Sequence, residues 1–406
     1  MSRALLLLAL ATACTASARA RVIPDAELEA PADAAALAPD APARDAAVEP
    51  AALVDASPLD LTTGGNPDVA TLRPPDAAAP EDALAAPEDG ADASAFAGQL
   101  LVAVGNDGKR MVSLNGKIWM DELRDTTGNR DGPKNLLAVA YGGGQVVAVG
   151  GGCTPTCVGR IVTFDGRVWH EVDASAALGK LTAVAYGNGA WVAVGSMPPA
   201  LHSLDGGLTW APAAKVAVPA GLRALAYGTV GTQPMFVAVG DGYTRVSSPD
   251  GITWSQLHAS DGTNAAYRSV AIGNGVVVAA GGRPDSGKVD SGRLIRSLDG
   301  ANWTDELVMG PEMPSVVYAD GKFFAFSPAG DDILEISADG KEWLEQTTNG
   351  AGSNVAVGRL GITRFFLSRI SPSTIKFSTD GYTWGQSLRM SMTGDAILNA
   401  FVIAGP

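Results

Sequence analysis

The chain has 406 residues, with 43 acidic against 29 basic side chains and a formal charge of -14. This acidic balance argues against a nucleic-acid binder, which needs a basic surface for the phosphate backbone. Its 3 cysteines are too few for a disulfide-rich scaffold or a four-cysteine zinc site, and no apolar run approaches the ~20 residues of a membrane-spanning helix.

Residues 1–21 have the features of an export signal. Arg3 supplies a positive charge, and a short apolar run follows at residues 4–11. Small residues then lead to Cys14 (ATAC), which resembles the lipobox of bacterial lipoproteins. The resemblance implies that Cys14 is lipidated and becomes the mature N-terminus of a cell-envelope protein, with the outer membrane as the expected location. The alternative is ordinary secretion, with cleavage after Ala18 or Ala20 and loss of Cys14.

Residues 22–98 are dominated by Ala, Pro, Asp and Glu. They carry 16 acidic and 2 basic side chains, so the negative charge belongs to this segment and the rest of the chain is close to neutral. Prolines recur throughout and aromatic residues are absent until Phe96, which leaves little to sustain a helix or to drive collapse. We predict a disordered, extended spacer that holds the following domain away from a membrane anchor.

From residue 99 onward, seven segments share the form Ser/Thr-x-Asp/Asn-Gly followed by a tryptophan, and successive tryptophans are 40 to 50 residues apart. The shared acidic or amide residues are Asn115, Asp165, Asp205, Asp250, Asp299, Asp339 and Asp380. The shared tryptophans are Trp119, Trp169, Trp210, Trp254, Trp303, Trp343 and Trp384. A period of this length, with several short strands per unit, is typical of propeller blades.

Each unit also contains a preceding hairpin of short strands rich in Val and Ala, as in residues 181–186 and 191–195. Four strands per unit follow. The first unit begins at Gln99 without an inner strand, and residues 397–403 form a surplus strand at the C-terminus. We therefore predict an all-β fold over residues 99–406: a seven-bladed β-propeller with four antiparallel strands per blade, closed by the C-terminal strand.

The repeated turns resemble the Asp-box, or bacterial neuraminidase repeat, of sialidase-like propellers. Residues 203–210 (SLDGGLTW) match that motif in full, and the other copies are one residue shorter. An aspartate in such a turn can accept backbone N–H bonds, glycine takes the positive φ, and the tryptophan buries a large apolar face. We therefore expect a structural role for the shared Asp, Asn and Trp residues.

No catalytic constellation is recognisable in the sequence. Sialidases need an arginine triad with a tyrosine–carboxylate nucleophile, and glycosidases need two carboxylates about 5–10 Å apart across a cleft. We therefore expect no enzyme, no cofactor and no metal site, but a monomeric, surface-tethered binding or assembly module for a protein or glycan, similar to photosystem assembly-factor-like propellers. The alternatives are a sialidase-like glycoside hydrolase and a structural envelope lipoprotein without a discrete ligand.

Four arginines recur near the start of the third strand of a unit. Arg110, Arg160 and Arg245 stand three residues before the Ser or Thr of their turn, and Arg293 stands four before. Loops at that end share a face with the loops between blades, so a cluster of guanidinium groups there could bind carboxylates or sulfated glycans. The alternative is that each arginine packs its stem over a neighbouring strand.

Cys153 and Cys157 are the pair that remains once Cys14 is lipidated or removed. In an oxidising compartment we expect a disulfide between them. Aspartate-containing loops at 125–131 and 285–290 could hold calcium, but a solvated charged loop is the favoured interpretation.

Overall fold

The structure is a computed structural model, and every residue that it describes belongs to one compact unit, Ala86–Pro406. It describes residues 98–404 except 116–118, 126–131, 155, 214–220, 259–263, 284–290, 329, 352, 361–362, 372–373, 386–387 and 390–397. The export signal and the spacer expected from the sequence lie outside the described residues. Within the described part, no helix has the length and apolar character needed to cross a membrane.

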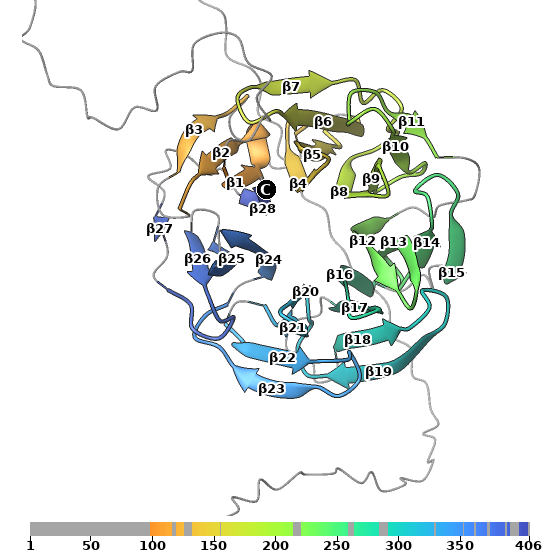
Figure 1. The fold of residues 1–406 in the computed structure, drawn as a ribbon, viewed down its shortest axis with the longest axis vertical. Coiled ribbons are helices and arrows are strands. Elements are labelled where there is room, and N and C mark those ends of the chain that lie inside the picture. Colours follow the sequence, from red (N-terminus) through yellow and green to blue (C-terminus); the bar gives the residue numbers. More distant parts are fainter. Residues whose placement is uncertain are drawn as a thin grey trace, which may run out of the picture. The chain divides into compact units, whose positions relative to one another are not determined.

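Seven four-stranded antiparallel sheets form a ring of blades, which confirms the predicted seven-bladed β-propeller (Figure 1). From the axis outward, blade 1 contains β28 (Leu398–Ala404), β1 (Leu100–Gly105), β2 (Arg110–Ser113) and β3 (Met120–Leu123). In the same direction, blade 2 contains β4 (Leu136–Gly142), β5 (Gln145–Gly152), β6 (Val158–Phe164) and β7 (Trp169–Val172). Blade 3 contains β8 (Leu181–Gly187), β9 (Ala190–Gly195), β10 (Leu201–Ser203) and β11 (Ala211–Pro212).

The remaining four blades follow the chain in order around the ring (Figure 1). Blade 4 contains β12 (Leu222–Val230), β13 (Gln233–Gly240), β14 (Arg245–Ser248) and β15 (Ser255–His258). Blade 5 contains β16 (Ala266–Gly273), β17 (Val276–Gly282), β18 (Gly292–Ser297) and β19 (Trp303–Met309). Blade 6 contains β20 (Ser315–Ala319), β21 (Lys322–Phe326), β22 (Ile333–Ser337) and β23 (Leu344–Thr347). Blade 7 contains β24 (Ser353–Leu360), β25 (Thr363–Ser371), β26 (Thr374–Ser378) and β27 (Leu388–Arg389).

The C-terminal strand closes the ring, as predicted. β28 pairs antiparallel with β1, with Val402 opposite Val102, and so supplies the inner strand of blade 1. Blade 1 is thus built from both ends of the propeller, and Figure 1 shows β28 beside β1 near the axis. This pairing covers the strand edge that β1 would otherwise expose.

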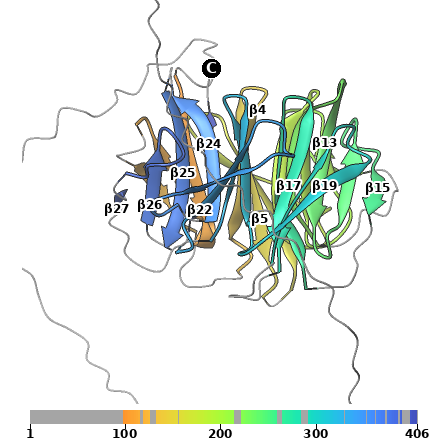
Figure 2. The ribbon, with the colours of Figure 1, turned by 90° about the horizontal axis from the view of Figure 1, so that it is seen from below.

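The up-and-down course of the strands places the connecting loops on two opposite faces (Figure 2). One face carries the loops from second to third strands and the loops between blades, such as 153–157 and 173–180; we call it the entry face. The other carries the hairpins from first to second strands and the tryptophan turns, such as 203–210; we call it the turn face.

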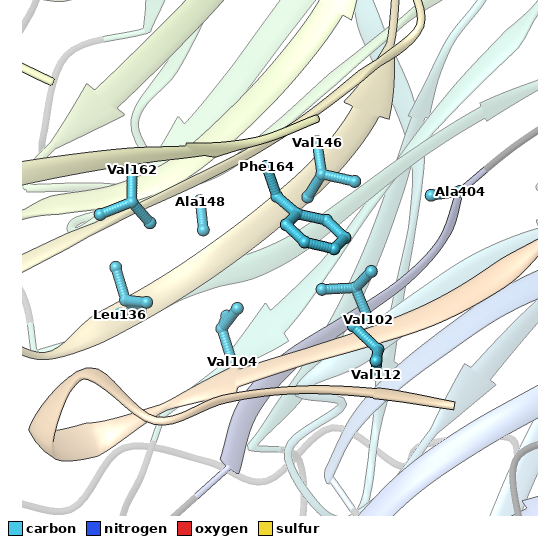
Figure 3. Close-up of a cluster of buried hydrophobic side chains, with 9 residues drawn as sticks. All are labelled: Val102, Val104, Val112, Leu136, Val146, Ala148, Val162, Phe164 and Ala404. Carbon is cyan, nitrogen blue, oxygen red and sulfur yellow. The ribbon is translucent and has the colours of Figure 1, made fainter. Parts of the chain in front are cut away.

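Apolar side chains on both faces of each sheet bury the blades against one another. Between blades 1 and 2, small and branched side chains, mostly from the second and third strands, pack around one aromatic ring (Figure 3). The buried residues of this cluster are Val102, Val104, Val112, Leu136, Val146, Ala148, Val162, Phe164 and Ala404. Because both sheet faces are buried, the second strands have near-continuous apolar sequences rather than alternating ones.

A glycine near the end of an inner strand receives a large side chain from the next blade. Gly187 lies under the ring of Tyr227, and a Cβ at this glycine would come 2.1 Å from the ring. The same contact recurs for the pairs Gly142–Tyr186, Gly228–Ile272, Gly273–Tyr318 and Gly358–Ile403. The last pair joins blade 7 to β28, so the contact continues across the closure of the ring. These glycines are needed because the strands approach closely at the axis.

Candidate functional site

The repeated turns are held by a shared set of hydrogen bonds. Asp250 accepts N–H bonds from Ile252 (2.9 Å) and Thr253 (2.7 Å), and Ser248 donates its hydroxyl to the same carboxylate oxygen. The indole of Trp254 donates to the carbonyl oxygen of Gly251 at 3.2 Å. The complete set recurs around Asp205, Asp339 and Asp380.

The electrostatics of these turns agree with a structural role. Hydrogen bonds from the hydroxyl and N–H of Thr209 lower the pKa of Asp205 to about 2. Backbone N–H groups of Asn302 and Ala301 lower the pKa of Asp299 to about 2. Both carboxylates are therefore ionised at neutral pH and bound to the turn itself. In blade 1, the Asn115 side chain takes the place of the aspartate and lies 3.4 Å from the hydroxyl of Ser113.

Blade 2 departs from this pattern because its strand register differs. Phe164, not Thr163, lies opposite Val146 at the position where the other turns have serine, as Ser248 opposite Phe236 shows. The hydroxyl of Thr163 is buried and has no hydrogen-bond partner in the described part of the chain. The turn is a tighter hairpin in which Trp169 begins β7 and stacks on Phe164 at 4.7 Å, while Asp165 still accepts two backbone N–H bonds.

The four arginines noted in the sequence occupy two different strand positions. Arg110 and Arg245 lie opposite the valine that precedes the second-strand glycine, Val104 and Val239. Arg160 and Arg293 lie opposite that glycine itself, at Gly150 and Gly281. Because neighbouring residues of a strand point to opposite sheet faces, the side chains of these two pairs of arginines point toward different blade interfaces.

Arg110 and Arg245 each cover a tryptophan of the following blade. The guanidinium carbon of Arg110 lies 5.7 Å from the ring centroid of Trp169. That of Arg245 lies 5.6 Å from Trp303 and 5.7 Å from Tyr267. These are cation–π contacts between blades, and they match the alternative in which the arginines pack over neighbouring strands.

Arg160 lies at the centre of a charge network between blades 1 and 2. It is 3% exposed and makes a forked pair with Glu171, through Nε to Oε1 (2.9 Å) and Nη2 to Oε2 (2.8 Å). Nη2 also donates to Asp125 at 2.5 Å, Nη1 donates to the carbonyl of Lys134, and the other oxygen of Asp125 binds Arg110. We call Arg110, Asp125, Arg160 and Glu171 the charge network.

The charge network unites two of the four arginines and leaves the other two apart. Arg245 and Arg293 belong to blades 4 and 5, and Arg293 has its Nε 3.6 Å from Glu306 of its own blade. Hydrogen bonding from Arg160 lowers the pKa of the Glu171 carboxyl, so this group is ionised at neutral pH. A ligand role for the four arginines stays a prediction.

An open groove of about 370 Å³ lies beside the charge network, at the entry-face end of β6 and β7. We call it the blade-2 groove. Its lining residues are Val158, Gly159, Arg160, Glu171, Val172, Asp173, Ala174, Ser175 and Ala177. Its volume is at the lower end of the range for ligand sites, which is about 300–1,000 Å³.

One side of the blade-2 groove is an unpaired strand edge. In the other six blades the fourth strand pairs with the third as far as the first residue of the third strand. These pairs are Arg110–Leu123, Leu201–Pro212, Arg245–His258, Gly292–Met309, Ile333–Thr347 and Thr374–Arg389. In blade 2 the corresponding pairing stops at Ile161–Val172, so Val158, Gly159 and Arg160 have no fourth-strand partner among the residues described.

A disulfide joins Cys153 and Cys157 in the loop that leads into β6. The loop therefore closes at the same end of blade 2 as the groove. Among the described residues, no group of three or more His, Cys, Asp or Glu side chains could hold a metal ion. Of the two loops considered for calcium, 285–290 lies outside the described residues, and Asp125 of the other is bound by two arginines.

Glu335 on β22 is a buried carboxyl group that no motif in the sequence had marked. It pairs with Ala325, and in five other blades the residue opposite the equivalent alanine is apolar and buried. Those residues are Met111, Val162, Leu201, Val246 and Ile295. Burial, with a smaller contribution from Glu345 on the adjacent strand, raises the pKa of Glu335 to about 7. A single charged residue in an otherwise apolar repeat position was the signal available in the sequence.

Comparison with known proteins finds similarity to solved structures at low sequence identity. No family model matches the chain, and no curated protein matches it. Among solved structures, YCF48 bound to D1 peptide is similar over 62% of this chain and 81% of that chain, at 15% identity and a TM-score of 0.44. YCF48 from Cyanidioschyzon merolae covers 66% and 94%, at 14% identity and a TM-score of 0.45. The computationally designed Ika8 protein covers 75% and 87%, at 17% identity and a TM-score of 0.48.

Proposed function

We propose that this protein is a non-catalytic binding module that presents the blade-2 groove to a protein partner. The observation that carries the proposal is the groove itself, bounded by the unpaired edge of β6 and by a charge network whose members are already held in ion pairs. Groups fixed in this way form a rigid, shaped surface, which reduces the cost of ordering on binding. A protein partner is favoured over a glycan because a strand edge offers main-chain groups to another main chain.

The Glu171 carboxylate of the groove is poorly suited to general acid catalysis. A general acid works best with a pKa near the operating pH, whereas hydrogen bonding from Arg160 lowers the pKa of Glu171. Glu335 has a pKa of about 7, but it is 6% exposed and pairs with Ala325 of the cluster between blades 5 and 6. A glycoside hydrolase would require two carboxylates facing one cleft, and this geometry does not support that alternative. The alternative of a structural envelope lipoprotein without a ligand gives no role to the groove.

The proposed cellular setting rests on the sequence. The basic Arg3, the apolar residues 4–11 and Cys14 support export and lipidation, and residues 22–98 would act as the spacer. The lipid would be the sole membrane contact of a monomeric chain, since an acidic spacer is not attracted to anionic lipid. The shared turn hydrogen bonds support an assignment to the Asp-box family, with blade 2 as a variant.

Site-specific photo-crosslinking tests the proposal in intact cells that produce the full chain. A benzophenone amino acid at Leu178, exposed in the loop that lines the groove but outside the lining itself, should capture a discrete protein. The same group at Leu204, exposed on the turn face of blade 3, is the matched control and should not capture it. Equal capture from both positions would show that the groove is not the binding surface, and capture of a glycan from Leu178 would replace the protein partner by a carbohydrate.

A further inference from the structure

We infer that the blade-2 groove binds an extended peptide segment as an added antiparallel strand, with a lysine or arginine of that segment beside Glu171. This inference rests on the proposed function and specifies its ligand. The bound segment would continue the line of β7 past Val172 and pair with Val158, Gly159 and Arg160. Three strand residues span about 10 Å, which is enough for a short stretch of main-chain pairing.

The edge of β6 is already held in an extended conformation. On its inner side, Val158 pairs with Gly152 and Arg160 pairs with Gly150, so β5 fixes the strand. The disulfide between Cys153 and Cys157 closes the loop immediately before it. A peptide that adds to this edge therefore meets a preformed template, so binding does not have to order the strand itself.

The chain itself turns away from this edge after β7. Asp173 accepts the N–H of Ser175 at 2.9 Å, and the N–H of Ala177 donates to the carbonyl of Ala174 at 2.9 Å. A Cβ on Gly159 would come 2.4 Å from the Cβ of Ala177, so this loop packs closely over the side-chain direction of Gly159. The loop thus lies across one sheet face of β6, and the hydrogen-bonding edge remains open to the groove.

The exposed charges of the groove favour a basic side chain. The carboxylate-bearing side chain of Glu171 is 53% exposed, whereas Arg160 is 3% exposed and bound to two carboxylates. Asp173 adds a second exposed carboxylate. Arg160 and Glu171 lie on the same face of blade 2, because Glu171 is opposite Val162, two residues from Arg160. A residue added opposite Arg160 would point to that face and could place a cationic group against Glu171.

Defined peptides test this inference on the full chain. The probe is a capped peptide of about five residues with alternating valine and lysine. One comparison peptide has glutamate in place of lysine. Another carries N-methyl groups on alternate amides, which removes main-chain hydrogen-bond donors and keeps the side chains. Binding is measured by NMR or by hydrogen exchange of the segment that contains residues 158–164.

The lysine peptide should protect the edge residues of β6, and N-methylation should weaken binding about tenfold through lost main-chain hydrogen bonds. Ser175→Trp, which fills the groove, should abolish binding. Leu178→Trp, in the same loop but exposed outside the groove lining, is the matched control and should bind normally. Thermal unfolding of both variants shows whether either has lost its fold.

The possible results separate this inference from the broader function. Equal binding of the N-methylated peptide would overturn strand addition, and equal or tighter binding of the glutamate peptide would overturn the preference for a basic side chain. Absence of any protection at about 1 mM peptide would overturn the inference. If Ser175→Trp leaves capture of the cellular partner from Leu178 unchanged, this site is wrong while a binding function elsewhere on the propeller survives. If no partner is captured at all but the lysine peptide binds, the site stands and the cellular proposal fails.

Discussion

Replacing Glu335 by glutamine should stabilise the propeller at neutral and alkaline pH. The carboxyl group lies at a position that is apolar in five other blades, and burial raises its pKa from 4.5 to about 7. The folded protein therefore binds this proton more tightly than the unfolded chain does. The associated stability is fully present below about pH 4.5 and is lost as the pH rises through about 7.

The size of the effect follows from the same values. The difference between 4.5 and about 7 corresponds to roughly 3 kcal/mol in the free energy of unfolding. Glutamine has nearly the same shape but no charge, so Glu335→Gln should prevent most of the stability loss that the parent shows as the pH rises through about 7. Glu345 contributes the smaller part of the rise in pKa, and Glu345→Gln should therefore move the transition of Glu335 to lower pH.

Urea unfolding at about pH 5 and about pH 8 measures this difference directly. The comparison between parent and variant cancels the contributions of all other titrating groups. Glu342→Gln, at an exposed position of the same blade, is the matched control and should behave like the parent. If Glu335→Gln loses as much stability as the parent between the two pH values, ionisation of Glu335 does not destabilise the folded protein. The reasoning from its burial at an otherwise apolar repeat position would then be wrong.

Three further predictions concern the ring and its anchor. Deletion of residues 396–406 removes the inner strand of blade 1 and should cause aggregation, measured by light scattering; a truncated protein that melts like the parent would contradict the closure. Gly187→Ala drives a Cβ into Tyr227 and should cost about 1–3 kcal/mol in denaturant unfolding. Gly310→Ala, where the Cβ meets nothing within 4 Å, is its control and should be nearly neutral. Cys14→Ser should release the protein from membranes in cell fractionation, and a mature N-terminus found after Cys14 by mass spectrometry would refute lipidation.

The blade number and the closure could be predicted from the sequence because each depends on a repeated local signal. The tryptophan turns recur once per blade, and the surplus strand at Leu398–Ala404 matches the one missing before Leu100. The number of blades follows from counting the repeats, and the closure follows from the rule that sheet edges are paired or covered. The hydrogen bonds around Asp250 also follow from residue type, since a short carboxylate next to glycine binds the N–H groups of its own turn.

The candidate site could not be predicted in the same way because it depends on strand register and strand length. The alignment of Thr163 with the serines of other turns hides a shift of one residue, which places Phe164 opposite Val146. The spacing of Arg160 and Arg110 from their turns is equal, yet one lies opposite a glycine and the other opposite a valine. A one-residue difference reverses the sheet face to which a side chain points, and spacing within a single strand carries no information about its neighbour.

The blade-2 groove likewise arises from a difference in length between two paired strands, β6 and β7. β6 has 7 residues and β7 has 4, and neither length is marked by a motif. The turn that ends β7 follows Val172, where Asp173 binds the N–H of Ser175. Only the pairing of the two strands shows that the start of β6 extends beyond its neighbour.

Amide-resolved hydrogen exchange of Val158, Gly159 and Arg160 tests most directly whether blade 2 offers an open strand edge for a partner. We expect fast exchange in the free chain for those of the three amides that point away from β5, and protection of the same amides when a captured partner or the lysine peptide is bound. The amides of Ile161, Val162 and Thr163, which lie between β5 and β7, should be protected in both states. Slow exchange of all three edge amides in the free chain, unchanged by any ligand, would show that the edge is closed and that blade 2 offers no strand edge to a partner.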